Sequence, residues 1–166
     1  DGKAERIHVR NLASFVNQLG VPLEVPGLGR IMVDTAYGGD SFVVVDAQSL
    51  GFRHSPDEAH AMAKLGVQIT AAADEQLGFR HPENPDWRHF SFCLFAGPPT
   101  RVSDGWETSH AVSVRPGKID RSPTGTAVSA RLAILAAKGQ IGPGEVLRAR
   151  SLVGGQFEGR IVGAAR

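Results

Sequence analysis

Cysteine is nearly absent from this chain: Cys93 is the single one among 166 residues, which excludes a disulfide framework within the chain. The sequence also lacks any stretch approaching the roughly 20 apolar residues that a membrane-spanning helix needs. Basic and acidic residues nearly balance, at 18 and 17, and no basic stripe or polybasic run stands out. The charged amino-terminus does not have the pattern of a signal peptide. We therefore expect a cytoplasmic protein that binds neither nucleic acid nor a membrane, with a small metabolite as its partner.

The composition that is present is that of an ordinary globular domain. Hydrophobic residues make up 42% of the chain and charged residues 21%, which is enough for one domain with a real core. Polar–apolar alternation and β-prone residues predict strands at 6–10, 30–37, 41–46, 89–95, 109–114, 145–150 and 156–162. The prolines and glycines between residues 21 and 29 predict extended chain and turns, and residues 38–40 predict a hairpin turn.

Two helices are predicted. Ser55 followed by Pro56 and two acidic residues is typical of a helix start, and the apolar spacing extends that helix to about residue 76. Gly66 weakens its middle slightly. The second helix covers about 126–138, where alanine and leucine dominate, and ends at Gly139. Several strands around two helices indicate an α+β fold in which antiparallel hairpins wrap a helix.

The segment from Asp120 to Arg131 carries the strongest functional signal. It leads into the second helix, whose start exposes unpaired backbone N–H groups and a partial positive charge. Gly125 lets the backbone approach a ligand closely, and Thr124 and Thr126 add hydroxyl groups. Such an anion cradle suits a carboxylate or a phosphate. Because the carboxylate of Asp120 lies just upstream and can pair with an ammonium group, the segment suits a zwitterion such as an amino acid.

The residues alone leave a second interpretation open. Thr-Gly-Thr before a helix also serves as a capping loop, and Asp120 also serves as an ion-pair partner of Arg121 or Arg131. Helix caps far outnumber ligand sites, so on residue chemistry alone the capping interpretation has the greater weight. The segment is not a Walker phosphate loop, because it lacks the Gly-Lys-Ser/Thr ending.

A resemblance adds what the residue chemistry does not supply. Asp-Arg-Ser-Pro-Thr-Gly-Thr-Ala-Val-Ser-Ala-Arg-Leu-Ala, residues 120–133, resembles the second active-site motif of the proline racemase family. That family includes proline racemase, 4-hydroxyproline epimerase and trans-3-hydroxy-L-proline dehydratase. Further segments resemble the family in the same order, at 25–39, 81–85, 95–99 and 157–163. The resemblance therefore covers nearly the whole chain.

The resemblance implies a fold, a mechanism and a set of roles. The fold is that of diaminopimelate epimerase, in which each of two similar lobes wraps an antiparallel sheet around a central helix. The racemases need no metal and no organic cofactor: one cysteine from each lobe faces the α-carbon of proline or hydroxyproline, and one removes the proton that the other returns. Asp120 would contact the ring amine, and Gly125 and Thr126 would hold the carboxylate. Thr124 would face the α-carbon or the hydroxyl group.

This sequence departs from the family pattern at two points. Thr124 stands where the racemases have cysteine, and a threonine hydroxyl is far less acidic than a thiol. The threonine-containing members resemble trans-3-hydroxy-L-proline dehydratases, which need only one strong base. The second departure is the absent Cys-Gly-His motif. Cys93 lies in a predicted strand, and we expect it to be a buried core residue.

These departures set the expected organisation and the functional hypotheses. The absent motif implies that residues 1–166 are a single lobe, which lacks the lobe carrying the catalytic base. The start at Asp1 without an initiator methionine agrees with an excised or processed fragment. The first hypothesis is a lobe of a trans-3-hydroxy-L-proline dehydratase. The others are a racemase or epimerase lobe with an unusual threonine, and an inactive isolated lobe whose apolar lobe–lobe face favours a homodimer. His110, in a predicted strand, is a further candidate to face the site.

Overall fold

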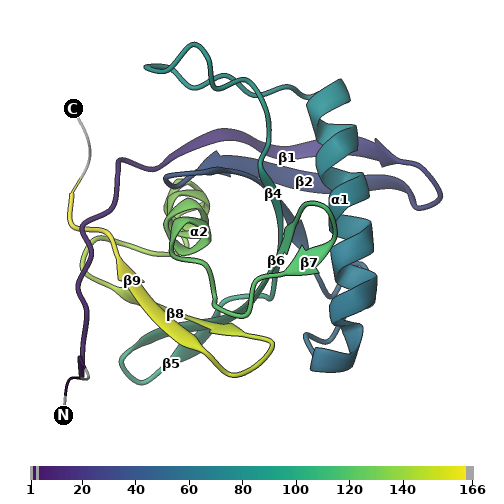
Figure 1. The fold of residues 1–166 in the computed structure, drawn as a ribbon. Coiled ribbons are helices and arrows are strands. Elements are labelled where there is room, and N and C mark those ends of the chain that lie inside the picture. The colour runs from purple at the N-terminus through teal and green to yellow at the C-terminus, as the bar shows by residue number, and fades with distance from the viewer. Residues whose placement is uncertain (1, 3, 164–166) are drawn as a thin grey trace.

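The computed structural model describes residues 2 and 4–163 and shows one sheet with two helices packed against it (Figure 1). The helices are α1 (Ala59–Gln76), which follows a short 3-10 turn η1 (Pro56–Glu58), and α2 (Gly125–Ala137). The nine strands are β1 (Phe15–Val25), β2 (Gly29–Tyr37), β3 (Ser41–Asp46), β4 (Phe92–Ala96), β5 (Thr100–Val102), β6 (Gly105–Val114), β7 (Lys118–Ile119), β8 (Val146–Ser151) and β9 (Gln156–Arg160). The predicted α+β class is confirmed.

The sheet is mixed rather than purely antiparallel. Its order is β1-β2-β3-β4-β6-β8-β9, with the short strands β5 and β7 also paired to β6. The pairs β3–β4 and β6–β8 are parallel, and the other pairs are antiparallel. A parallel pair needs a long crossover, and α1 and α2 supply one to each of these two pairs. The expectation of an antiparallel sheet was therefore wrong for these two pairs, because a helix between two strands allows them to pair in parallel.

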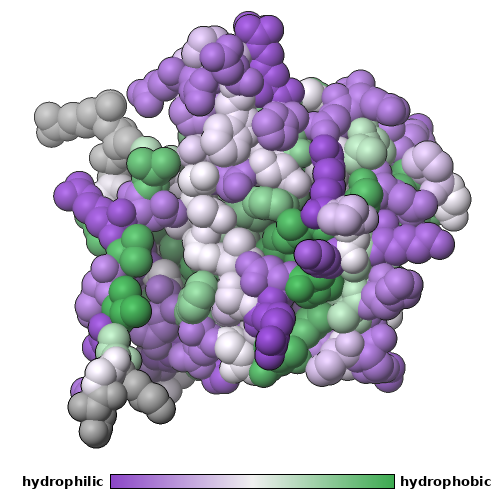
Figure 2. Space-filling model, in the orientation of Figure 1, coloured by the Kyte–Doolittle hydropathy of each residue, from purple (hydrophilic) through white to green (hydrophobic). Residues whose placement is uncertain are grey.

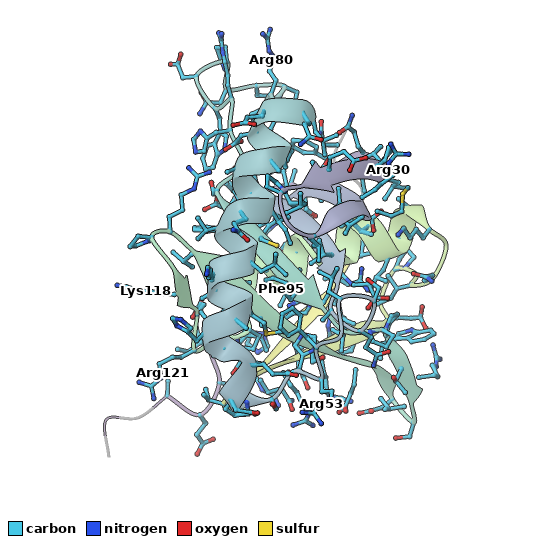
Figure 3. All side chains as sticks on the ribbon, turned by 90° about the vertical axis from the view of Figure 1, so that its right-hand side faces the viewer. Arg30, Arg53, Arg80, Phe95, Lys118 and Arg121 are labelled. Atoms are coloured by element: carbon cyan, nitrogen blue, oxygen red, sulfur yellow. The ribbon has the colours of Figure 1, made fainter. Side chains whose placement is uncertain are left out.

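The two helices lie on opposite faces of the sheet because successive strand residues point to opposite faces. Val43, Val45, Cys93 and Phe95 belong to the apolar cluster that includes Met62, Ile69 and Ala73 of α1. Phe42, Val44, Leu94 and Val112 belong to the cluster that includes Ala127, Ala130 and Ile134 of α2. Figure 3 shows Phe95 between α1 and the sheet. Within the described residues, neither helix is both long enough and apolar enough to cross a membrane.

The sheet curls around α2. This helix contacts β1 and β2 at one end of the strand order and β8 and β9 at the other end (Figure 1). The contact with β9 is close at Gly159, where an added Cβ would lie 2.7 Å from Val128 and 2.8 Å from Leu132. The expected sheet wrapped around a central helix is therefore confirmed.

The amino-terminal segment differs from the prediction. Residues 6–10 alternate as a strand would, yet they have no sheet partner within the described part of the chain. The first strand is instead β1, which contains residues 21–25; the predicted extended chain and turn at 21–29 are therefore the end of β1 and its turn into β2. Pro22 fits within it because β1 is an edge strand, where a missing N–H costs no ladder bond. Figure 2 shows apolar residues along the margin where this segment runs, and Ile7 and Val9 are 77% and 80% exposed.

Candidate active site

The candidate site lies where the chain leaves β7 and enters α2. The N–H of Asp120 donates to the carbonyl of Val112 at 2.9 Å, which anchors the loop to β6. The helix begins at Gly125, one residue before the predicted start. A bond from the N–H of Val128 to the carbonyl of Thr124, 3.0 Å long, closes the first helical turn. The N–H groups of Gly125 and Thr126 therefore lie at the positively polarised end of α2, without an i→i−4 partner in the helix.

Asp120 and Thr124 are brought together by this loop. The Thr124 hydroxyl donates to Asp120 Oδ2 at 2.6 Å. The other oxygen, Oδ1, accepts the backbone N–H of Ser122 at 2.8 Å. The Ser122 hydroxyl in turn accepts the N–H of Thr124 at 3.1 Å. The carboxylate and the hydroxyl that the sequence singled out thus form one hydrogen-bonded unit at the start of the helix.

This geometry argues against the simple capping interpretation. Thr124 occupies the N-cap position, yet its side chain makes no capping hydrogen bond, because the hydroxyl is turned towards Asp120. Asp120 is not an ion-pair partner of Arg121 or Arg131 within the described residues, and Arg121 is exposed at the surface (Figure 3). The Thr124 hydroxyl and the Asp120 carboxylate therefore bond to each other and not to the backbone N–H groups of the helix N-terminus. Those N–H groups are left for a ligand.

The backbone of Thr124 is strained. Its φ is 62°, in the region that favours glycine, and Thr124 and His54 are the two non-glycine residues with positive φ in the described chain. For a β-branched residue this conformation is an outlier that costs on the order of 1–3 kcal/mol. Such strain persists only where the surroundings over-determine it, and it gathers at functional sites. At this position it aims the Thr124 side chain at Asp120.

The space beside the helix start is open on one side and tightly closed on the other. A Cβ added to Gly125 would meet no atom within 4 Å. In contrast, a Cβ on Gly38 would lie 2.2 Å from the Thr126 carbonyl oxygen, and one on Gly39 would lie 3.0 Å from the Thr126 methyl group. The hairpin turn that joins β2 to β3 therefore packs directly on the first turn of α2. Asn11 joins the two by donating to the carbonyl of Gly38 at 2.7 Å and to the hydroxyl of Ser129 in α2 at 2.7 Å.

Sequence patterns missed this second wall of the site. The turn at residues 38–40 was expected only as a hairpin connection, and nothing in the sequence places it against α2. Two adjacent glycines are a signal for close backbone approach, but that signal does not name the partner. Asn11 gave no signal at all.

A buried histidine and a partly buried arginine lie behind the loop. His110 of β6 is fully buried, and its Nδ1 lies 3.3 Å from the carbonyl oxygen of Pro123. Its Nε2 is buried without a hydrogen-bond partner, as is Nε of Arg131. A terminal nitrogen of Arg131 donates to the carbonyl of Gly97 at 3.4 Å. His110 thus contacts the loop that carries the site, although it lies behind it rather than at its open side.

Cys93 lies in the core, as predicted. It is fully buried in β4 between β3 and β6, and burial raises the pKa of its thiol far above the usual value. A protonated, enclosed thiol is neither a base nor a nucleophile. Among the residues that the structure describes, no three histidine, cysteine, aspartate or glutamate side chains are grouped so that they could hold a metal ion.

Comparisons with known proteins give a consistent result. A family model described as proline racemase matches residues 1–166. A hydroxyproline epimerase from Agrobacterium vitis, solved with bound trans-4-hydroxy-L-proline, is 30% identical with a TM-score of 0.80. A probable proline racemase from Agrobacterium radiobacter K84, solved with bound carbonate, is 31% identical with a TM-score of 0.80. Each match covers 89% of this chain but 42% of the solved chain, so this chain spans less than half the length of these relatives.

Proposed function

This chain belongs to the proline racemase family, and on that premise we propose that it is the substrate-binding lobe of an enzyme acting at the α-carbon of a proline or hydroxyproline. The observation that carries the proposal is the Asp120–Thr124 bond at the open N-terminus of α2. The same few atoms offer a site for an anion and, beside it, a carboxylate for a cation. That is the pairing that a zwitterionic amino acid needs.

The roles follow from charge and position. The substrate carboxylate binds the N–H groups of Gly125 and Thr126, where the helix end is positively polarised. The ring ammonium pairs with the Asp120 carboxylate, which retains lone pairs beyond those used by Ser122 and Thr124. Because the Thr124 hydroxyl donates its hydrogen to Asp120, its oxygen lone pairs point elsewhere and are available to a substrate group.

We propose dehydration of trans-3-hydroxy-L-proline as the specific reaction. A base takes the α-proton, the electrons of that bond form a double bond between the α- and β-carbons, and the 3-hydroxyl leaves as water after gaining a proton from solvent. The resulting enamine tautomerises to a cyclic imine. Thr124 supports this assignment because its hydroxyl is too weak an acid to return a proton to the opposite face, as racemisation requires.

The base of this reaction comes from outside the chain. Cys93, the single cysteine of the sequence, is buried and protonated. We propose that a second lobe supplies a cysteine to the open face beside Gly125. The exposed apolar residues of the amino-terminal segment, among them Ile7 and Val9, support an uncovered lobe–lobe surface.

The test uses the full-length protein and three substrates. With trans-3-hydroxy-L-proline we expect an imine product, trapped by borohydride reduction and identified by mass spectrometry. Racemisation of proline or epimerisation of 4-hydroxyproline without any imine would refute the dehydratase. The variant Asp120→Asn, nearly isosteric but uncharged, is expected to raise KM by weakening the contact to the ring ammonium.

A second candidate is an isolated lobe without catalysis. The buried state of Cys93 favours it for these 166 residues taken alone, and the exposed apolar segment would then favour a homodimer. Proton exchange at the α-carbon in D₂O, together with a sizing column, separates the candidates. Measurable exchange catalysed by this chain alone would rule out the inactive lobe.

A further inference from the structure

A buried histidine lies directly behind the loop that presents Thr124. His110 is on the face of the sheet that carries α2, in register with Ala96 of β4 and Ser151 of β8. Ser151 accepts the N–H of Gly155 at 3.1 Å, and a Cβ on Gly155 would lie 3.6 Å from the Pro123 ring. His110 and the turn after Ser151 therefore both lie next to Pro123, on the same face of the sheet.

The contact of His110 fixes its tautomer. The Pro123 carbonyl oxygen can only accept, so Nδ1 of His110 must carry the hydrogen. Burial, aided by the positive charge of Arg131, lowers the pKa of His110 to about 3, so the ring is neutral and carries one hydrogen. That hydrogen is on Nδ1, and Nε2 is an unprotonated, buried atom without a partner in the described structure.

The carbonyl that His110 holds belongs to the peptide bond that leads into Thr124. This is the residue whose φ of 62° needs support from its surroundings. Ser122 holds the N–H side of the same peptide plane by accepting from Thr124 at 3.1 Å. With His110 on the oxygen and Ser122 on the nitrogen, the plane is held at both ends, which prevents a rotation that would release the strain.

We propose that His110 is a positioning residue of the site: its Nδ1–H holds the Pro123 carbonyl and so keeps Thr124 in the left-handed conformation that aims its hydroxyl at Asp120. This proposal rests on the proposed function in one respect: the role that the positioned Thr124 hydroxyl has towards the substrate. The titratable groups that act on His110 are Arg131, which reaches it from α2, and His54, from the loop before η1. Both disfavour a second proton on the ring. The His110 ring therefore stays neutral, with Nδ1–H directed at the Pro123 carbonyl.

The first test measures the tautomer in the wild-type 166-residue chain. Nitrogen-15 NMR of the histidine side chains is expected to show His110 as the neutral Nδ1–H form at pH 7, and the signals of the exposed His60 of α1 serve as an internal reference for comparison. An Nε2–H form of His110, or a ring that gains a second proton above pH 5, would overturn the proposal.

The second test compares three substitutions. Asparagine at His110 places an amide N–H close to the position of Nδ1, glutamine places it nearer Nε2, and leucine provides none. Backbone shifts of Thr124 are expected to stay native in His110→Asn and to move in His110→Gln and His110→Leu. In the full-length enzyme, kcat should fall ~10–100-fold in the glutamine and leucine variants and recover in the asparagine variant, with a smaller change in KM.

The two proposals fail separately. Native Thr124 shifts in all three variants would overturn the positioning role, whatever the enzyme does. Displaced Thr124 shifts in the glutamine and leucine variants, together with a wild-type full-length protein that turns over none of the three substrates, would leave the positioning role intact and refute the proposed function. If the leucine variant does not fold, the asparagine–glutamine pair still decides, since the two differ chiefly in where the N–H lies.

Discussion

At the scale of single residues, the proposed dehydratase assignment rests on Thr124. Its hydroxyl is held 2.6 Å from Asp120, in a backbone conformation that a β-branched residue normally avoids. The strain and the hydrogen bond both aim one small side chain at a carboxylate beside an open helix end. The Thr124 hydroxyl is held in a fixed position but is only very weakly acidic. It therefore suits hydrogen bonding to a substrate better than donation of a proton to the α-carbon.

Substituting Thr124→Cys in the full-length protein is expected to produce a gain of racemisation or epimerisation. A thiol at this position is acidic enough to deliver a proton to the face opposite the base. The measurement is deuterium incorporation with inversion at the α-carbon in D₂O. The matched control is Thr124→Ser, which keeps a hydroxyl for Asp120 but provides no thiol. Equal inversion by both variants would show that Thr124 does not face the α-carbon.

His110 also predicts a pH dependence of stability. Its pKa is about 3 in the folded chain, against about 6.5 for an unfolded histidine. Between these values the unfolded state binds a proton that the folded state does not, so the free energy of unfolding falls as the pH falls. From pH 7 to pH 5 the expected loss from this residue is about 2 kcal/mol.

The measurement is urea unfolding of the wild-type chain and of His110→Asn at pH 7, 6 and 5. The variant lacks the titrating ring, so its stability should change less over this range, and the difference between the proteins isolates His110. A parallel pH dependence in both proteins would mean that His110 is protonated in the folded chain.

At the scale of elements, α1 shows how packing overrides local preference. Gly66 lies in the middle of this helix, where helix propensity alone predicts that alanine would stabilise by about 1 kcal/mol. The structure predicts the opposite sign. A Cβ at Gly66 would lie 2.3 Å from Cβ and 2.6 Å from Oγ of Ser113, and the Ser113 hydroxyl is itself engaged with the carbonyl of Ala63.

Gly66→Ala is therefore expected to destabilise the chain by ~1–3 kcal/mol, because α1 must move away from β6. Denaturant unfolding measures this. Ala71→Gly, on the exposed side of the same helix, is the control, and it should cost about 1 kcal/mol from propensity alone. A more stable Gly66→Ala protein would show that the approach of α1 to β6 is looser than the structure describes.

Much of the element order could be predicted from the sequence, and the reason lies in local patterns. Caps and spacing defined α1 and α2 to within a few residues, and alternation located β2, β3, β4 and β6. The parallel pairings and the strands β5 and β7 could not be predicted, because pairing is decided by tertiary contacts. Residues 6–10 show the reverse error: a strand pattern without a neighbouring strand in the described chain.

The same division holds for the site. Asp120, Thr124, Gly125 and Thr126 lie within seven residues, so a local motif was enough to identify them. The turn at Gly38 comes from a distant segment, and its contact with α2 depends on how the sheet curls. For His110, the sequence gave a strand position but no sign that the ring would meet the Pro123 carbonyl.

At the scale of the whole molecule, the fold leaves the start of α2, the proposed substrate site, open and encloses the single thiol of the chain. The open helix end of α2 faces outward, whereas the single thiol lies in β4, in the middle of the sheet. No local movement of a loop can expose Cys93, because β3 and β6 flank it and α1 covers it. Its exposure requires global unfolding.

Alkylation of Cys93 therefore tests whether the proposed base lies outside this chain. In the native chain we expect no reaction with iodoacetamide over hours, and a rate that rises with urea in parallel with the loss of circular dichroism. In the full-length protein, Cys93→Ala should keep its turnover, while native alkylation at another cysteine abolishes it. Rapid modification of Cys93 in the native chain would place a reactive thiol inside this lobe, and a base from a second lobe would then no longer be needed.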